Sequence, residues 1–141
     1  MKIKITSKSG ILPAYETEGS AGMDLRAYLD EPVVIQPGKR YLVPTGISIE
    51  LPRGYEAQVR ARSGLAVKHG IGLVNGIGTI DSDYRGEIKV GVVNLSDAPY
   101  TFHSGDRVAQ LCILPVCLAE FCEAQLDETQ RGAGGFGSSG K

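Results

Sequence analysis

Glycine and proline interrupt this chain at short intervals, which limits the length of any helix it can form. The 141 residues include 19 glycines and 7 prolines, and both residue types end helices and mark turns. Between them, short runs that alternate in polarity or are rich in β-branched residues recur along the chain. The pattern predicts an all-β protein, a distorted jelly roll or β-barrel with one short helix and a flexible glycine-rich C-terminal tail.

Twelve short runs are the predicted strands. Val90, Val92 and Val93 place apolar side chains on both faces of one of them, so we expect a second sheet or a neighbouring subunit to cover both faces. The predicted strands are Lys2–Ile5, Met23–Tyr28, Pro32–Ile35, Arg40–Pro44, Ile47–Glu50, Tyr55–Ala61, Gly72–Leu73, Thr79–Ile80, Glu87–Asn94, Tyr100–Phe102, Arg107–Leu114 and Ala119–Glu123.

Composition sets the class of protein. With 42% hydrophobic residues the chain can build one modest core, which we assign to residues 1–126, with 127–141 as a flexible arm. A formal charge of -1 gives no reason to expect a nucleic-acid polymer or an anionic membrane as partner. No apolar run approaches the roughly 20 residues of a membrane span, and the N-terminus alternates in polarity. We therefore expect a soluble intracellular protein of the cytoplasm or nucleus.

Cysteine and histidine give no sign of a metal site. Three cysteines at positions 112, 117 and 122 lie in or beside apolar segments, and we expect them to be buried reduced thiols. His69 and His103 have no partner at metal-ligand spacing, so a zinc site is not expected.

The stretch Asn75–Glu87 concentrates polar side chains between two apolar runs. Glycines at 76, 78 and 86 allow its backbone to turn tightly and to approach a ligand closely. Two carboxylates, Asp81 and Asp83, stand beside Tyr84 and Arg85. This is more chemistry than a turn needs, and we interpret the stretch as a substrate-binding hairpin.

A short helix is predicted over 63–70, capped by Ser63 and ended by Gly70. Its free amides, the Ser63 hydroxyl and the preceding Arg62 form a candidate anion site. A plain structural cap explains the same residues equally well. Arg60 lies two residues before Arg62, so both would share one face of a strand.

Two further polar residues allow more than one interpretation. Asp24 precedes Arg26, and an exposed ion pair would account for both. Gln110 stands among apolar neighbours and needs a hydrogen-bond partner if it is buried. It is a candidate for ligand contact or for a buried network.

The last segment is rich in glycine and contains one aromatic residue. Two strings there match dinucleotide-binding and P-loop patterns formally, but no strand precedes them and no helix can follow. A disordered tail is the simpler interpretation. Arg131, Phe136, Ser138 and Ser139 nevertheless fit a tail that closes over a polyphosphate while its ring stacks on a base.

Five segments, taken in order, resemble the motifs of the homotrimeric deoxyuridine triphosphatase (dUTPase) family. The resemblance implies a jelly-roll homotrimer whose active sites take motifs from all three chains. It implies Mg²⁺-dependent hydrolysis of dUTP to dUMP and pyrophosphate by attack of water on the α-phosphorus. This reaction would limit uracil incorporation into DNA and supply dUMP for thymidylate synthesis. The segments are Ala21–Ala27, Arg62–Ala66, Asn75–Glu87, Gly105–Leu111 and Arg131–Gly140.

The resemblance also implies a role for each motif residue. Asp81 would orient and deprotonate the attacking water, and Tyr84 would pack on the deoxyribose and exclude a 2′-hydroxyl. A Mg²⁺ ion would bridge the phosphates, and Asp24 would act through its water shell and not as a direct ligand. The residues that would read uracil are Asn75, Gly78, Thr79, Ile80 and Lys89. Those that would hold the α- and β-phosphates are Arg62, Ser63, Gly64 and Gln110. The tail residues that would close on the base and γ-phosphate are Arg131, Phe136, Gly137, Ser138 and Ser139.

Two rival functions remain at this stage. The deoxycytidine triphosphate deaminases share the expected fold and part of the hairpin, but the chain shows no additional acid that would activate water at the base. A catalytically silent binding module is a rival of another class. The intact motif around Asp81 argues against it.

Overall fold

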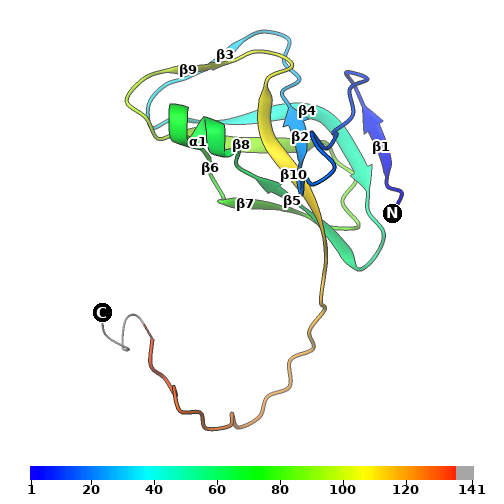
Figure 1. Ribbon diagram of the computed structural model, residues 1–141, viewed down its shortest axis with the longest axis vertical. Coiled ribbons are helices and arrows are strands. Elements are labelled where there is room, and N and C mark those ends of the chain that lie inside the picture. The colour runs from blue at the N-terminus through cyan, green and yellow to red at the C-terminus, as the bar shows by residue number, and fades with distance from the viewer. Residues whose placement is uncertain (136–141) are drawn as a thin grey trace.

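The computed structural model describes residues 1–135 as ten strands and one short helix (Figure 1). Every strand pair in this part of the chain is antiparallel. None of its helices is long and apolar enough to cross a membrane. The elements are β1 (Lys4–Ser7), β2 (Met23–Arg26), β3 (Val33–Ile35), β4 (Arg40–Glu50), β5 (Tyr55–Arg60), α1 (Ser63–His69), β6 (Ile71–Leu73), β7 (Ile77–Ile80), β8 (Ile88–Asn94), β9 (Tyr100–Phe102) and β10 (Arg107–Pro115).

Two four-stranded sheets share one apolar core. Their strand orders are β1-β4-β8-β6 and β2-β10-β5-β7, while β3 and β9 form a separate pair. Strand β5 illustrates how the sequence builds the core: Ala57 and Val59 are buried, whereas Gln58 and Arg60 are half-buried. Successive side chains of a strand point to opposite faces, so the alternation of β5 produces one core-facing side.

The predicted strands are largely confirmed, with ends shifted by one or two residues. Arg40–Pro44 and Ile47–Glu50, predicted as two strands, form the single strand β4. The register with β8 shifts between Pro44 and Ile47, and Gly46 adopts a φ of 68° there. Such a bulge bends a strand without ending it, because glycine accepts the left-handed conformation.

The chain beyond β10 differs from the prediction. Ala119–Glu123 is not a strand, since no strand of the described part pairs with it and a strand needs a ladder partner for its backbone groups. Cys112 is buried as predicted, but Cys117 and Cys122 are exposed. Both belong to the segment after β10, which leaves the sheets and runs away from them (Figure 1).

Candidate active site

The Asn75–Glu87 stretch, predicted as a hairpin, is instead a connection between the two sheets, because β7 and β8 belong to different sheets and do not pair. We keep the name hairpin for this stretch, which borders a cavity of about 530 Å³. Its first strand, β7, pairs with β5 of one sheet, and the following β8 pairs with β4 and β6 of the other. We call this space the hairpin cavity. It is lined by the residues predicted to read uracil, by the predicted general base Asp81 and by the predicted sugar contact Tyr84. The uracil-reading residues are Asn75, Gly78, Thr79, Ile80 and Lys89.

A tight turn shapes the polar end of the hairpin cavity. The Tyr84 amide donates to the Asp81 carbonyl at 3.1 Å, and the Tyr84 hydroxyl donates to the Glu87 carbonyl at 3.0 Å. Arg85 donates to the carbonyls of Ser82 and Tyr84 at 2.7 and 2.9 Å. The Arg85 guanidinium thus braces the turn, and the exposed Asp81 carboxylate borders the cavity.

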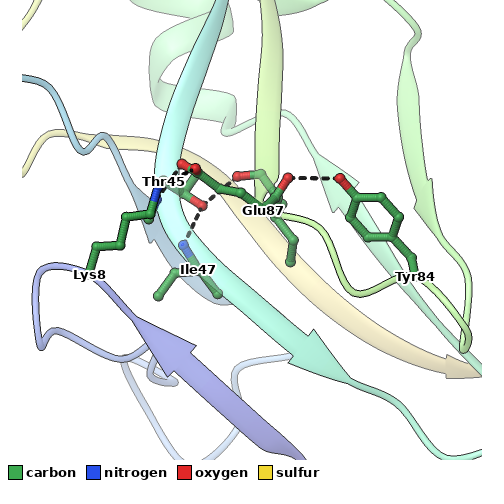
Figure 2. Close-up of polar contacts among 7 residues, drawn as sticks. Lys8, Thr45, Ile47, Tyr84 and Glu87 are labelled. Atoms are coloured by element: carbon green, nitrogen blue, oxygen red, sulfur yellow. Dashed lines mark hydrogen bonds and ion pairs between the residues drawn. The ribbon is translucent and has the colours of Figure 1, made fainter.

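Glu87, at the end of the turn, joins it to two other segments (Figure 2). Its carboxylate accepts from Lys8 Nζ at 2.8 Å and from the Gly46 amide at 2.9 Å. The hydrogen bond from Lys8 lowers the pKa of Glu87, burial opposes this, and the Gly46 amide lowers the pKa further. The hydrogen bond to Glu87 in turn raises the pKa of Lys8. Both groups are therefore charged at neutral pH.

A second cavity of about 340 Å³ lies at the start of α1, beside β2 and β10. We call it the arginine cavity, because Arg62 and Arg107 both line it. Two guanidinium groups give it the donors that planar, bidentate recognition of phosphate requires. The other predicted site residues that line it are Asp24, Ser63, Gly64 and Gln110.

Asp24 holds the two arginines in place. Its Oδ1 lies 3.0 Å from Arg62 Nε and its Oδ2 lies 3.3 Å from Arg107 Nη1. The proposed pair with Arg26 is wrong, since the Arg26 guanidinium donates instead to the Gly105 carbonyl at 2.8 Å. Each carboxylate oxygen of Asp24 thus faces a guanidinium group, and Glu16 is a second carboxylate that lines the cavity.

The helix start differs in detail from the prediction. Arg62, and not Ser63, is the N-cap residue, with extended backbone and no side-chain cap hydrogen bond. Ser63 is the first helical residue, so its hydroxyl is not used as a cap. The C-terminal end is as predicted: Gly70 has a φ of 65° and its amide bonds the Ala66 carbonyl.

Gln110 has the hydrogen-bond partner that its position requires. Its Nε2 donates to the Ala61 carbonyl at 2.9 Å, which connects β10 to the segment that carries Arg62. Its Oε1 lies against Gly22, where a Cβ would approach to 2.5 Å. Glycine at position 22 therefore leaves the space that the Gln110 amide occupies.

The described part of the arm, residues 116–135, lines neither cavity of the chain. Arg131 is exposed, and its Nε donates to the Gly134 carbonyl at 2.8 Å within a local turn. Phe136, Gly137, Ser138 and Ser139 lie outside the described residues. The predicted boundary near residue 126 and the closing role of the arm stay predictions.

The predicted site residues thus divide into two groups within one chain. The hairpin cavity and the arginine cavity share no lining residue in the described part of the molecule. The hairpin cavity is lined by Asp81, Tyr84 and the backbone of β7, and the arginine cavity is lined by Arg62 and Arg107. A ligand with a base, a sugar and a phosphate chain would need both groups.

Sequence reasoning missed Arg107, Lys8 and Glu87. Arg107 was predicted only as the first residue of a strand and as part of the Gly105–Leu111 segment, although an arginine at a strand start near other motif residues is a signal for anion binding. Lys8 and Glu87 are 79 residues apart, and no local pattern connects them.

Comparison with known proteins identifies the family. The dUTPase family model matches residues 8–140. The deoxyuridine 5′-triphosphate nucleotidohydrolase of Finegoldia magna is 56% identical, over 99% of this chain and 99% of that protein.

Solved structures agree with this assignment. A structure of the Staphylococcus bacteriophage 80alpha dUTPase with dUPNHPP has a TM-score of 0.88 at 25% identity, covering 99% of each chain. A mutant dUTPase from phage phi11 of S. aureus, solved with a structural Mg(II) ion, has a TM-score of 0.78 at 23% identity, over 89% of this chain and 98% of that one. The predicted jelly-roll fold is confirmed, and the chain belongs to the dUTPase family of dUTP-hydrolysing enzymes.

Proposed function

We propose that this chain hydrolyses dUTP to dUMP and pyrophosphate by attack of water on the α-phosphorus, with Asp81 as the general base. The observation that carries the proposal is the hairpin cavity, where Asp81, Tyr84 and the backbone of β7 border one space. By its chemistry this reaction limits uracil incorporation into DNA and supplies dUMP for thymidylate synthesis.

The base and the sugar are read within the hairpin cavity. Asn75 and the backbone of Gly78, Thr79 and Ile80, with the backbone at Lys89, bind the edge of uracil and leave no space for a thymine methyl. Steric exclusion is needed, since a missing methyl alone discriminates by only about 1–3 kcal/mol. Tyr84 packs on the deoxyribose and rejects a 2′-hydroxyl.

Asp81 orients the attacking water and accepts its proton. A positioned base of this kind contributes about 10²–10⁴-fold to the rate. The carboxylate is exposed at the cavity border and its backbone carbonyl holds the turn through the Tyr84 amide. The position of the carboxylate is therefore tied to that of the sugar-packing ring.

The phosphates are bound in the arginine cavity. Arg62, Ser63, Gly64 and Gln110 hold the α- and β-phosphates, and Arg107 is added to this group on the strength of its place in the cavity. The tail from Arg131, with Phe136, Gly137, Ser138 and Ser139, closes on the base and the γ-phosphate.

Magnesium is the proposed cofactor. A Mg²⁺ ion usually binds substrate phosphate oxygens and keeps several waters, and when bound it neutralises phosphate charge. Both oxygens of Asp24 already face guanidinium groups, which fits a contact through a metal-bound water better than direct ligation. The phage phi11 dUTPase, which has a similar fold, coordinates a structural Mg(II) ion.

We further propose that the functional unit is a homotrimer with shared sites. Two observations support it: the two cavities are separate in one chain, and the arm carries strongly exposed apolar side chains. Leu118 is 74%, Phe121 98% and Leu126 89% exposed, and apolar surface of this kind marks an interface.

The test is an assay of pyrophosphate release from dUTP, dCTP, dTTP, dATP and dGTP, with Mg²⁺ and with a chelator. We expect release from dUTP alone, and its loss in the chelator. Equal hydrolysis of all five nucleotides, or of none, would overturn the proposal.

A further inference from the structure

We propose that Gly86 and Glu87 are specificity-determining residues that hold the Tyr84 ring where it rejects a ribose. Neither residue has to touch the substrate for this role. The inference rests on the proposed function of Tyr84 as the sugar contact, and it assigns the discrimination between deoxyribose and ribose to the turn as well as to the ring.

The Tyr84 ring lies directly over Gly86. A Cβ at position 86 would be 2.6 Å from Tyr84 Cζ and 3.0 Å from Cε2, and closer still to the hydroxyl oxygen. Gly86 is not among the glycines with positive φ, so an alanine could adopt its backbone conformation. The requirement for glycine at 86 therefore comes from the ring, and any larger residue would push the ring outward and leave the backbone in place.

The hydroxyl of Tyr84 fixes the outer end of the ring. It donates to the Glu87 carbonyl at 3.0 Å, while the Tyr84 amide donates to the Asp81 carbonyl. The ring is thus held at both ends by the turn, with Gly86 beneath it. Such a ring is set in place before substrate arrives, which is the condition for steric rejection of a 2′-hydroxyl.

The Glu87 side chain fixes the position of the Glu87 backbone carbonyl, which accepts the hydrogen bond from the Tyr84 hydroxyl. Lys8, Gly46 and Glu87 close a ring of three contacts. The Lys8 amide donates to the Gly46 carbonyl at 2.9 Å and the Gly46 amide donates to Glu87 Oε1 at 2.9 Å. Lys8 Nζ donates to Glu87 Oε2 at 2.8 Å (Figure 2). We call this ring the Lys8–Glu87 clamp.

The next residue is fixed to the same bulge of β4. The Thr45 hydroxyl donates to the Ile88 carbonyl at 2.6 Å and accepts from the Ile47 amide at 3.3 Å. Glycine suits position 46 of the bulge, because φ there is 68° and a Cβ would lie 3.1 Å from the Lys8 Cβ and 3.2 Å from the Tyr28 ring. The end of the hairpin is therefore anchored to segments that lie outside it.

Burial distinguishes this clamp from an ordinary surface ion pair. In the clamp the Lys8 side chain is 59% exposed but the Glu87 side chain only 17%, whereas the Lys4–Glu50 pair between β1 and β4 has side chains 82% and 44% exposed. Exposed pairs contribute little, but loss of the Glu87 carboxylate would leave the Gly46 amide without its acceptor. We infer that the chief effect of the clamp is to fix the position of the Glu87 carbonyl.

The test compares kcat/KM for dUTP and UTP in wild type, Gly86→Ala, Tyr84→Ala and the double variant. We expect Gly86→Ala to lower the dUTP-to-UTP ratio by roughly tenfold or more, as a pocket misfit of one carbon does. In the Tyr84→Ala background the same change should alter the ratio by less than about twofold, because the ring that it displaces is gone.

Gly19→Ala is the matched control for the added methyl group, since Gly19 has no positive φ and a Cβ there would have no neighbouring atom within 4 Å. It should keep the wild-type ratio. The inference would be overturned if Gly86→Ala kept the wild-type dUTP-to-UTP ratio. It would also be overturned if Gly86→Ala lowered this ratio equally in the presence and in the absence of the Tyr84 ring. A wild-type protein that hydrolyses dUTP and UTP equally would instead overturn the proposed role of Tyr84 itself.

The clamp gives a second measurement that does not depend on how Gly86→Ala folds. Lys8→Met should lower the dUTP-to-UTP ratio by a few-fold, about 2–5-fold, through a looser Glu87 carbonyl. Lys4→Met, which removes the exposed ion pair between β1 and β4, should leave the ratio unchanged. Equal ratios in Lys8→Met and wild type would remove the clamp from the proposal.

Discussion

Asp81 and Asp83 are two exposed carboxylates on one hairpin, and only Asp81 lines the hairpin cavity. Asp81→Asn keeps the size of the side chain but removes the proton acceptor, so we expect kcat for dUTP to fall by about 10²–10⁴-fold. Steady-state pyrophosphate release measures it. Asp83→Asn is the control and should retain nearly normal turnover. Near-normal turnover of Asp81→Asn would show that the base lies elsewhere.

The Lys8–Glu87 pair predicts a dependence of stability on pH. The pKa of Glu87 is below its ordinary value of 4.5, so the stabilisation by this carboxylate is complete above that pH and is lost as the pH falls through the folded-state pKa. The pKa of Lys8 is above its ordinary value of 10.5, so its stabilisation is complete below that pH and is lost as the pH rises further.

Urea unfolding of wild type and Glu87→Gln over a range of pH tests this linkage. The difference in the free energy of unfolding should be constant between the two ordinary pKa values and should shrink in acid. A difference that persists unchanged below the folded-state pKa of Glu87 would show that the charge is not its cause.

At the scale of elements, Asn94 ties the end of β8 to its neighbours. This fully buried side chain donates to the carbonyls of Ile35 and Ala98, each at 2.8 Å, and accepts from the amide and hydroxyl of Ser96. Asn94→Ala would leave buried backbone groups without partners. We expect a loss of about 1–3 kcal/mol in the free energy of unfolding.

Chemical denaturation would measure this loss. Asp97→Ala, an exposed change in the same turn, is the control and should stay within about 0.5 kcal/mol of wild type. A loss for Asn94→Ala no larger than for Asp97→Ala would mean that water replaces the missing amide.

At the scale of the whole molecule, shared sites predict that two inactive variants can restore activity together. One chain is Asp81→Asn, and the other is truncated after Glu128, which removes the tail motif. Neither should be active alone. In mixed trimers a site can take Asp81 from one chain and the tail from another, so we expect about a quarter of wild-type activity in a 1:1 mixture.

The mixture is made by co-expression or joint refolding, and size-exclusion chromatography checks that both variants still assemble. A truncated chain with full activity alone would reduce the tail to a linker. Absence of restored activity in mixed trimers would mean that each site uses the hairpin and the tail of the same chain.

The local pattern of the sequence was sufficient for most elements. Alternation predicted β5, and turn residues predicted the short helix, because side-chain direction and backbone preference depend on near neighbours. The predicted strand Ala119–Glu123 was wrong for the opposite reason: a strand also depends on a partner distant in sequence. The bulge that joins the two halves of β4 likewise depends on its contacts with Lys8 and β8.

The candidate site likewise has parts that near neighbours in the sequence determine and parts that distant partners determine. Residues close together in the sequence, from Asn75 to Lys89, were predicted as one group, and they line one cavity because one continuous stretch of chain carries them between the two sheets. The sequence by itself therefore determined the family, the all-β class and the residues of the hairpin.

Only the tertiary structure decided which distant charges meet. Asp24 pairs with Arg62 and Arg107 and not with its neighbour Arg26, and Lys8 reaches Glu87 across 79 positions. Ion pairs follow the distance between charges in space, and strand pairing sets that distance with no regard for separation along the chain.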